Sequence, residues 1–438
     1  MSNSIHLISL LLLASGLSIQ AQEKRAMTFD EMVGWERISE QRISDNGKWV
    51  FCKMEPWRGD ATILLYNDKG EEKGSFKPAA KAQFSSSSEY LLVTKTPPLK
   101  EVEAEKLKKT DKDKMPMNSL IISRLSGGME TIDSLKSYKL SETADWLAYQ
   151  RGSKKDSMLY IRSLDGMQQD SFPAVSDFGF AQKGNVLYVV SDSVLYTYIP
   201  QKGNNRISDK KGVFKKIAFN ENGSKLAYLF CPHKDSAATW SSLYLAENNT
   251  PGKLIAERGD KAFPASWIIS ENAPLYFSEN ASRLFFGTAP EPKQKDTTLL
   301  AENRPDVQVW SWDEKVQYTQ QSFNKATDLK RSYTAIYNLG SGRLLQLATA
   351  DEGNAIWALL STTRPYGTQS MWTARQFHDI YIINLETGER RQIKEKSPSY
   401  MRFSPKGKYT YWYQDQDSSW YTRSTADGKE YRLTTPQT

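Results

Sequence analysis

Two stretches far apart in the chain carry the same pattern: Ile43-Ser44-Asp45-Asn46-Gly47-Lys48-Trp49-Val50-Phe51 and Phe403-Ser404-Pro405-Lys406-Gly407-Lys408-Tyr409-Thr410-Tyr411. In both, an apolar residue precedes a turn that begins with Ser and contains Gly, and an apolar and aromatic run follows. Asn and Gly tolerate the left-handed backbone angles of tight turns, whereas β-branched and aromatic residues favour strands. The pattern therefore predicts a β-hairpin.

The hairpin pattern returns along the chain. Copies begin at Ile43, Phe84, Leu140, Phe180, Phe219, Phe277 and Phe403, and a weaker copy spans 352–359. A further aromatic strand follows most copies, and we expect these strands at Ile63–Tyr66, Leu159–Ile161, Leu195–Tyr198, Leu243–Leu245, Val307–Trp310 and Ile380–Ile383. Two hairpins make four antiparallel strands, and the tightest spacing approaches the roughly 40–45 residues of a four-stranded propeller blade. We therefore predict an all-β chain, a β-propeller of seven or eight blades, and leave open whether its ring closes within the chain.

The propeller region is expected to span residues 22–438, with two insertions of distinct composition. Residues 97–118 are rich in Lys, Glu and Asp, which favours a short solvated helix or a disordered segment. Residues 288–306 are rich in Pro, which favours an extended loop. We interpret both as tolerated surface loops, with a lid or docking element as the alternative.

Residues 1–21 have the features of a signal peptide. They contain no Lys, Arg, Asp or Glu, and the apolar run Leu7–Ala14 is too short to span a bilayer as a stable helix. Ala21 offers a small residue for cleavage before Gln22. We therefore expect an exported protein, periplasmic or secreted, with an uncleaved membrane anchor as the alternative.

Cysteine content and charge exclude two classes of protein. The chain contains 2 Cys residues, Cys52 and Cys231, so it is no disulfide scaffold, and we expect two buried free thiols rather than a bridge. The formal net charge is +7, but 58 basic residues are mixed with 51 acidic ones. Because no basic stripe alternates with aromatic residues, we interpret the charge as solvated surface and expect no nucleic-acid partner.

Several of these stretches resemble one peptidase family. The Ser404–Lys408 turn resembles the propeller repeat of TolB-like proteins and of S9 (prolyl oligopeptidase and dipeptidyl-peptidase-like) serine peptidases. Asp306–Asp313 and Met115–Leu120, with the insertions beside them, look like the large exported S9 peptidases of Bacteroidetes-type bacteria. The resemblance covers residues 27–438 and implies a propeller that covers a C-terminal α/β-hydrolase domain with a Ser, Asp and His triad.

The catalytic motif of that family does not carry over. A nucleophile elbow needs Gly-x-Ser-x-Gly, and of the 25 glycines only Gly16 has a Ser two positions later, within the signal peptide. The strand and helix alternation of a hydrolase domain is missing as well. We therefore expect the hydrolase domain to be absent from this chain, which is either part of a longer peptidase or an independent propeller that binds rather than cuts.

No single residue is assigned to a catalytic, cofactor or metal site. Dipeptidyl-peptidase relatives bind a substrate amino terminus with paired glutamates, but we interpret Glu71 and Glu72 as an ordinary polar turn. His233 lacks a second His or Cys at ligand spacing, which favours a loop histidine. Six tryptophans on or near expected strands are interpreted as blade packing, with carbohydrate stacking as the alternative; they are Trp35, Trp49, Trp146, Trp267, Trp357 and Trp412.

Three functions remain from the sequence. The leading hypothesis is a non-catalytic propeller region of an exported S9-type serine peptidase, which would gate the access of peptides to a hydrolase domain not present in this chain. The first alternative is a periplasmic TolB-like propeller that binds a protein partner without enzymatic activity. The second alternative is a carbohydrate-binding propeller.

Overall fold

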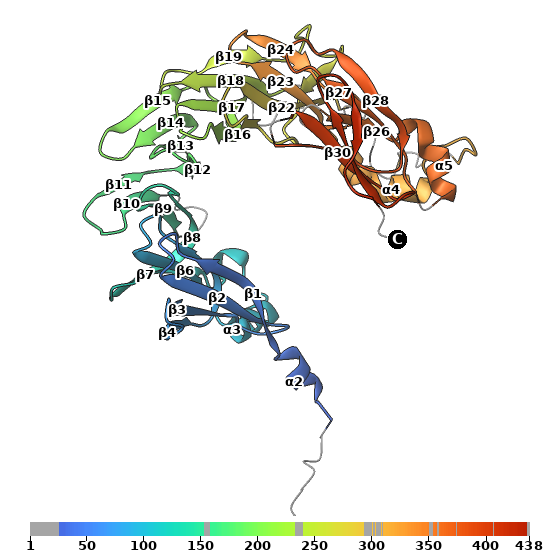
Figure 1. The fold of residues 1–438 in the computed structure, drawn as a ribbon. Coiled ribbons are helices and arrows are strands. Elements are labelled where there is room, and N and C mark those ends of the chain that lie inside the picture. Colours follow the sequence, from blue (N-terminus) through green and yellow to red (C-terminus); the bar gives the residue numbers. More distant parts are fainter. Residues whose placement is uncertain are drawn as a thin grey trace, which may run out of the picture. The chain divides into compact units, whose positions relative to one another are not determined.

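The structure is a computed structural model that describes residues 26–152, 158–232, 240–292, 300, 303, 308, 310–349, 354–356, 359–373, 375–405 and 407–435. The expected signal peptide, His233 and Trp357 lie outside the described residues, as does most of the Pro-rich segment 288–306. The chain divides into two compact units, residues 1–135 and 136–438. Each unit is built almost entirely of strands (Figure 1).

The first unit contains two antiparallel sheets. Helix α2 (Phe29–Val33) precedes the first sheet, which contains β1 (Glu36–Ile43), β2 (Trp49–Pro56), β3 (Thr62–Asn67) and β4 (Glu72–Phe76). The second contains β5 (Ala79–Phe84), β6 (Tyr90–Lys95), β7 (Asn118–Arg124) and the first part of β8 (Met129–Leu140). Between β6 and β7, the charged insertion forms helix α3 (Leu99–Leu107) and the short 3-10 helix η1 (Lys112–Lys114).

The second unit begins within β8. The rest of that strand continues into β9 (Trp146–Arg151), β10 (Leu159–Ser163) and β11 (Gln169–Phe172). The next sheets contain β12 (Val175–Phe180), β13 (Leu187–Ser191), β14 (Val194–Ile199) and β15 (Gly203–Ser208), then β16 (Val213–Phe219), β17 (Lys225–Cys231), β18 (Ser242–Glu247) and β19 (Lys253–Ala256).

Three further sheets complete the second unit. One has its first strand in two pieces and contains β20 (Trp267–Ile269), β21 (Tyr276–Phe277), β22 (Arg283–Pro290), β23 (Tyr333–Asn338) and β24 (Arg343–Gln346). The next contains β25 (Asn354–Ile356), β26 (Leu359–Thr362), β27 (His378–Ile383) and β28 (Arg390–Ser397). The last contains β29 (Arg402–Phe403), β30 (Tyr409–Gln414), β31 (Ser419–Ser424) and β32 (Glu430–Arg432).

Within each unit, neighbouring sheets pack against each other through buried apolar side chains. Phe51 of β2 and Leu91 of β6 belong to one buried cluster of the first unit. In the second unit, Leu229 of β17 shares a cluster with Phe286 of β22, and Ile380 of β27 shares one with Trp412 of β30. Consecutive four-stranded antiparallel sheets that pack in this way are β-propeller blades, which confirms the predicted fold class. Strand β8 pairs with β7 on one side and with β9 on the other, so it is counted in two blades. The described residues then form eight blades, which are numbered 1 to 8 in chain order.

The repeated Ser turn joins the first two strands of a blade. After β1, the Ser44 N–H donates to the Trp49 carbonyl at 2.9 Å, and the Trp49 N–H donates to Ser44 Oγ at 3.0 Å. Gly47 closes the turn with a φ of +71°, a backbone angle that glycine adopts without strain. The same bonds recur at Ser404 and Tyr409, so the turn is held by contacts within six residues.

Two expected strands differ in the structure. The third strand of blade 6 is Tyr333–Asn338 instead of Val307–Trp310, since the chain first leaves the sheet for a long insertion. Gln308 and Trp310 form no strand, while Val307 and Val309 lie outside the described residues. In the weak copy at 352–359, β25 is the first strand of its blade, whereas the pattern places the turn before it.

Candidate functional site

Two insertions in neighbouring blades form an aromatic pocket. The first lies between β22 and β23 and contains α4 (Tyr318–Asp328). The second lies between β26 and β27 and contains the 3-10 helix η3 (Arg364–Tyr366) and α5 (Gly367–Trp372). The pocket has a volume of about 420 Å³ and is lined by Trp310, Ser311, Trp312, Glu314, Gln317, Tyr318, Thr319, Gln321, Met371 and Trp372.

The backbones of the two insertions approach closely at one glycine. A Cβ atom on Gly367 would lie 2.8 Å from the Cβ of Lys315 and 3.1 Å from its carbonyl oxygen. A side chain at position 367 would therefore push the first insertion away. Glycine at the start of α5 brings the two walls of the pocket together.

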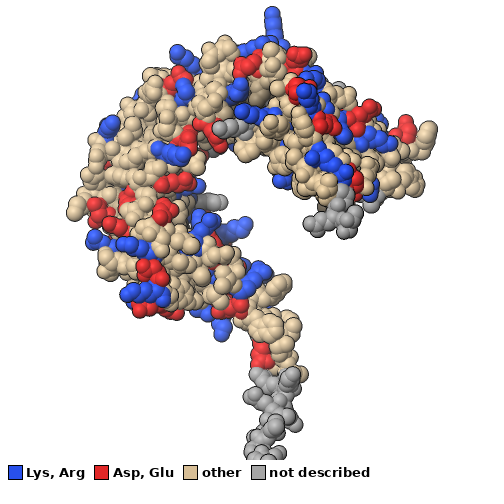
Figure 2. All heavy atoms as spheres, in the orientation of Figure 1, with Lys and Arg blue, Asp and Glu red and all other residues tan. Residues whose placement is uncertain are grey.

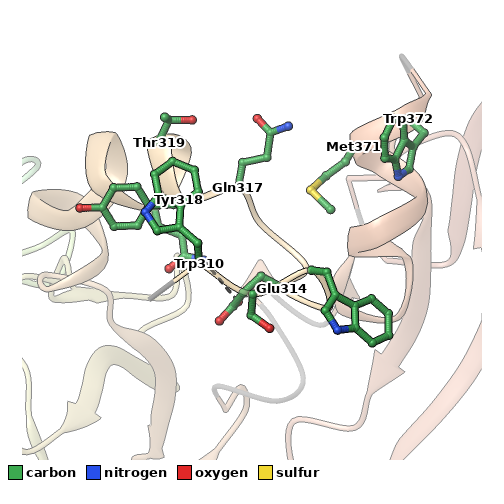
Figure 3. A pocket seen from close by; sticks show the side chains of 10 residues that line it. Trp310, Glu314, Gln317, Tyr318, Thr319, Met371 and Trp372 are labelled. Carbon is green, nitrogen blue, oxygen red and sulfur yellow. Dashed lines mark hydrogen bonds between the residues drawn. The ribbon is translucent and has the colours of Figure 1, made fainter. Parts of the chain in front are cut away.

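Aromatic rings form both walls of the pocket. The rings of Trp310 and Tyr318 contact each other, with centroids 4.7 Å apart and planes inclined by 39°. Figure 3 shows these two rings on one side and Met371 and Trp372 of α5 on the other, with Glu314 and Gln317 between them. The side chains of Trp312 and Trp372 are 95% and 86% exposed. Since folding buries little of these two rings, their aromatic faces remain free to contact a ligand.

Among the described residues that line the pocket, only Glu314 carries a charge. Gln321 Nε2 donates to Glu314 Oε2 at 3.3 Å and to the Val316 carbonyl at 2.8 Å, which orients the amide beside the carboxylate. Within the described part of the chain, Glu314 takes part in no ion pair. The pocket therefore combines aromatic surface with a carboxylate that no cation neutralises there.

A second cavity lies between blades 7 and 8. Its volume is about 820 Å³, and its lining includes Leu359, Ile380, Ile382, Tyr400, Met401, Phe403 and Pro405. The ring of Tyr400 lies 4.3 Å from the ring of His378, centroid to centroid. Because most of its lining is apolar, this groove suits an apolar group rather than a charged one.

The structure describes the two glutamates and the two cysteines that the sequence singled out. Glu71 and Glu72 lie at the β3–β4 turn, where hydrogen bonds from Lys73 and Asn67 hold the pKa of the Glu71 carboxyl below its ordinary value. Cys231 is buried and Cys52 is half-buried, and no disulfide joins them. Among the residues that the structure describes, no group of His, Cys, Asp and Glu is arranged to hold a metal ion, and no helix is both long and apolar enough to cross a membrane.

The interpretation of the tryptophans needs one correction. Trp146, Trp267 and Trp412 are buried in inter-blade clusters, and Trp49 packs at the edge of another. Trp35 is instead 61% exposed, because it precedes the fully solvent-facing end of β1 and no blade in the first unit covers it.

The pocket residues have no predicted role in the sequence. The sequence pattern places Trp310 at the end of an expected strand and Trp312 just after it, and it gives Trp372 no role. One sequence feature does point to these residues. Trp310 and Trp312 follow a Pro-rich segment, and the alternation of apolar and polar residues that marks a strand is interrupted at Trp310.

Lys and Arg are mixed with Asp and Glu over the face of the molecule in Figure 2. Seventeen ion pairs are formed by the described residues, and most of their members are partly exposed. Such pairs contribute little stability individually. On that face, the basic net charge is therefore not concentrated in a single basic patch.

No protein-family model and no curated protein matches the sequence. Among solved structures, the chain is similar to a eukaryotic initiation factor, with 13% identity, 94% of this chain and 90% of that chain covered, and a TM-score of 0.44. It is also similar to the β-propeller domain of the Trilobed protease from Pyrococcus furiosus, with 10% identity, 84% and 98% covered, and a TM-score of 0.35.

An acylaminoacyl peptidase in complex with Z-Gly-Gly-Phe-chloromethyl ketone matches with 10% identity over 89% of this chain, at a TM-score of 0.33. The match spans 58% of that peptidase. Since these TM-scores are all below 0.5, the fold assignment depends on the sheets and clusters of the chain itself. The similarity to propeller domains of prolyl oligopeptidase-type (S9) peptidases is a likeness at low identity.

Proposed function

We propose that this chain is the non-catalytic β-propeller region of an exported serine peptidase of the prolyl oligopeptidase type. In this proposal, the propeller gates the access of peptides to a hydrolase domain that is not part of this chain. Its mechanism is steric: packed blades and their insertions exclude folded proteins, whereas a short extended peptide passes.

The observation that carries this proposal is the aromatic pocket in the insertions of blades 6 and 7. Its described lining offers hydroxyl groups on Ser311, Thr319 and Tyr318, but no His or Lys that would activate a nucleophile. Ser311 Oγ donates a hydrogen bond to the Asp313 carboxylate, and no imidazole of the described lining completes a triad with these two side chains. Such a site can bind a ligand, while acyl transfer would need a triad elsewhere.

The proposal is tested in the organism that encodes the chain. Extracts are separated into exported and retained fractions, labelled with a fluorophosphonate probe for serine hydrolases, and blotted with an antibody against this chain. We expect the antibody to detect an exported protein larger than 49.9 kDa that also carries the label. The purified chain should release no product from prolyl or alanyl peptide substrates.

A different result separates the alternatives. An exported form of the size of this chain, without a serine-hydrolase label on it or on a co-purifying protein, contradicts the peptidase proposal. That result would favour the TolB-like alternative, a propeller that binds a protein partner. Hydrolysis by the purified chain would contradict its non-catalytic role.

A further inference from the structure

We propose that the aromatic pocket binds the cationic side chain, Lys or Arg, of an extended peptide. This inference rests on the proposed function and deepens it, because it names the class of peptide that the propeller would admit. The pocket is the one formed by the insertions of blades 6 and 7.

The charge of the pocket favours a cation. Among the described residues of the lining, only Glu314 is charged, and the described residues provide no ion pair for it. Gln321 Nε2 donates a hydrogen bond to Glu314 Oε2 at 3.3 Å. A carboxylate in this setting favours a ligand with a positive charge and disfavours an acidic one.

Aromatic side chains line the pocket around that carboxylate. The face of an indole or phenol ring is electron-rich and attracts ammonium and guanidinium groups. Trp310 and Tyr318 form one wall and Trp372 stands opposite (Figure 3). A lysine or arginine side chain also has an apolar stem, which would lie along these rings while its charged end reaches Glu314.

The site is already assembled without a ligand. The close approach of Gly367 to Lys315 joins the two insertions, and the contact between Trp310 and Tyr318 fixes one wall. A site that is already formed loses less conformational entropy on binding. The cavity of about 420 Å³ is large enough for one long side chain but small for a folded partner.

The test uses fluorescein-labelled pentapeptides, Ala-Ala-Lys-Ala-Ala and Ala-Ala-Arg-Ala-Ala. Matched peptides carry acetyl-lysine or norleucine at the central position. Binding to the full purified chain is followed by fluorescence anisotropy. We expect the cationic peptides to bind about tenfold more tightly than the neutral ones, as expected for one ion pair combined with cation–π contacts. Higher ionic strength should reduce this preference.

Variants then locate the effect. Glu314→Gln keeps the size of the side chain and should remove the preference for cationic peptides. Trp312→Ala together with Trp372→Ala should weaken binding of all four peptides. Both tryptophans are highly exposed, so folding should be retained, as circular dichroism would show. Trp57→Ala is the matched control, because Trp57 is 81% exposed and lies outside the pocket; it should bind like the parent chain.

Gly367→Val gives an independent test of how the pocket is assembled. A side chain at position 367 separates the two insertions and should reduce binding of the cationic peptides. Gly340→Val is its control, because no atom lies within 4 Å of a Cβ at Gly340.

Several outcomes overturn the inference. These are equal affinity for lysine and acetyl-lysine peptides, an unchanged preference in Glu314→Gln, no binding of any peptide, or binding of maltohexaose or cellohexaose alone. None of them alters the serine-hydrolase labelling that tests the proposed function. Conversely, a preference that depends on Glu314 in a protein without hydrolase label would support the pocket chemistry and contradict the peptidase proposal.

Discussion

The ring of Trp412 stacks on the ring of Tyr421, with centroids 5.6 Å apart and planes inclined by 16°. The two residues are direct cross-strand partners on β30 and β31. From the neighbouring blade, Lys394 Nζ lies 5.0 Å from the centroid of the Trp412 ring. Trp412 is thus one of the buried side chains through which blade 8 packs against blade 7.

Replacing Trp412 should therefore destabilise the second unit. The side chain is 2% exposed, so Trp412→Ala is expected to lower the free energy of unfolding by about 3–5 kcal/mol. Trp412→Phe should lower it clearly less, because the buried indole Nε1 has no hydrogen-bond partner among the described residues and its removal leaves nothing unpaired. Guanidinium chloride unfolding measures both. A loss in Trp412→Ala no larger than in the exposed control Trp57→Ala would contradict the packing role.

Gly223 and Gly407 occupy the same position in two copies of the repeated turn, one beginning with Asn220 and the other with Ser404. Substitution by alanine should destabilise the protein more at Gly223 than at Gly407. Gly223 and Gly407 have φ angles of +75° and +67°, so each substitution is expected to cost about 1 kcal/mol for the backbone. A Cβ on Gly223 would also lie 2.1 Å from Val186 Cγ1, whereas nothing lies within 4 Å of one on Gly407. Gly223→Ala should therefore be less stable than Gly407→Ala by a further 1–3 kcal/mol or so.

Thermal and denaturant unfolding of both variants check this difference. Both positions belong to the second unit, so the comparison concerns the same part of the chain. Equal free energies of unfolding for Gly223→Ala and Gly407→Ala would contradict the prediction. They would mean that the Val186 side chain moves away from the new methyl group without loss of stability.

Stability should depend on pH through His378. The imidazole is buried, and burial lowers its pKa from the ordinary value of 6.5. As the pH falls below that value, the unfolded chain takes up a proton at this imidazole while the folded chain still resists it, so the folded state loses stability. His378→Phe removes this contribution and keeps an aromatic ring beside Tyr400.

The measurement is the free energy of unfolding at pH values of about 7.5 to 5.5. We expect a smaller loss on acidification in His378→Phe than in the parent chain. Parallel curves for the two proteins would contradict the prediction.

The two cysteines should react as separate thiols. No disulfide joins them in the structure, where Cys231 is buried on β17 and Cys52 is half-buried on β2. Alkylation of the denatured, unreduced protein should add two labels by mass spectrometry, and the native protein should be labelled faster at Cys52. A mass that gains labels only after reduction would reveal a disulfide instead.

The repeated turns could be located from the sequence because the bonds that hold them are local. Ser44 and Trp49 exchange hydrogen bonds across six residues, and Gly47 supplies the left-handed angle. Strand assignment failed at Val307–Trp310, where an apolar and aromatic run lies in an insertion. The run has the residue types of a strand, but its described residues, Gln308 and Trp310, form no strand, and β23 pairs with β22 in the place expected for it.

The sequence by itself determined the hairpins and, through their repetition, the propeller blades, because each turn depends on residues within a few positions of one another. Only the tertiary structure decided which aromatic side chains are buried and which are offered to a ligand. The residue type is the same at positions 412 and 372, yet Trp412 packs between two blades whereas Trp372 lines a pocket. The difference arises because that pocket forms only where the insertion carrying Lys315 meets the one that begins α5 at Gly367, and such a long-range contact has no local sequence signal.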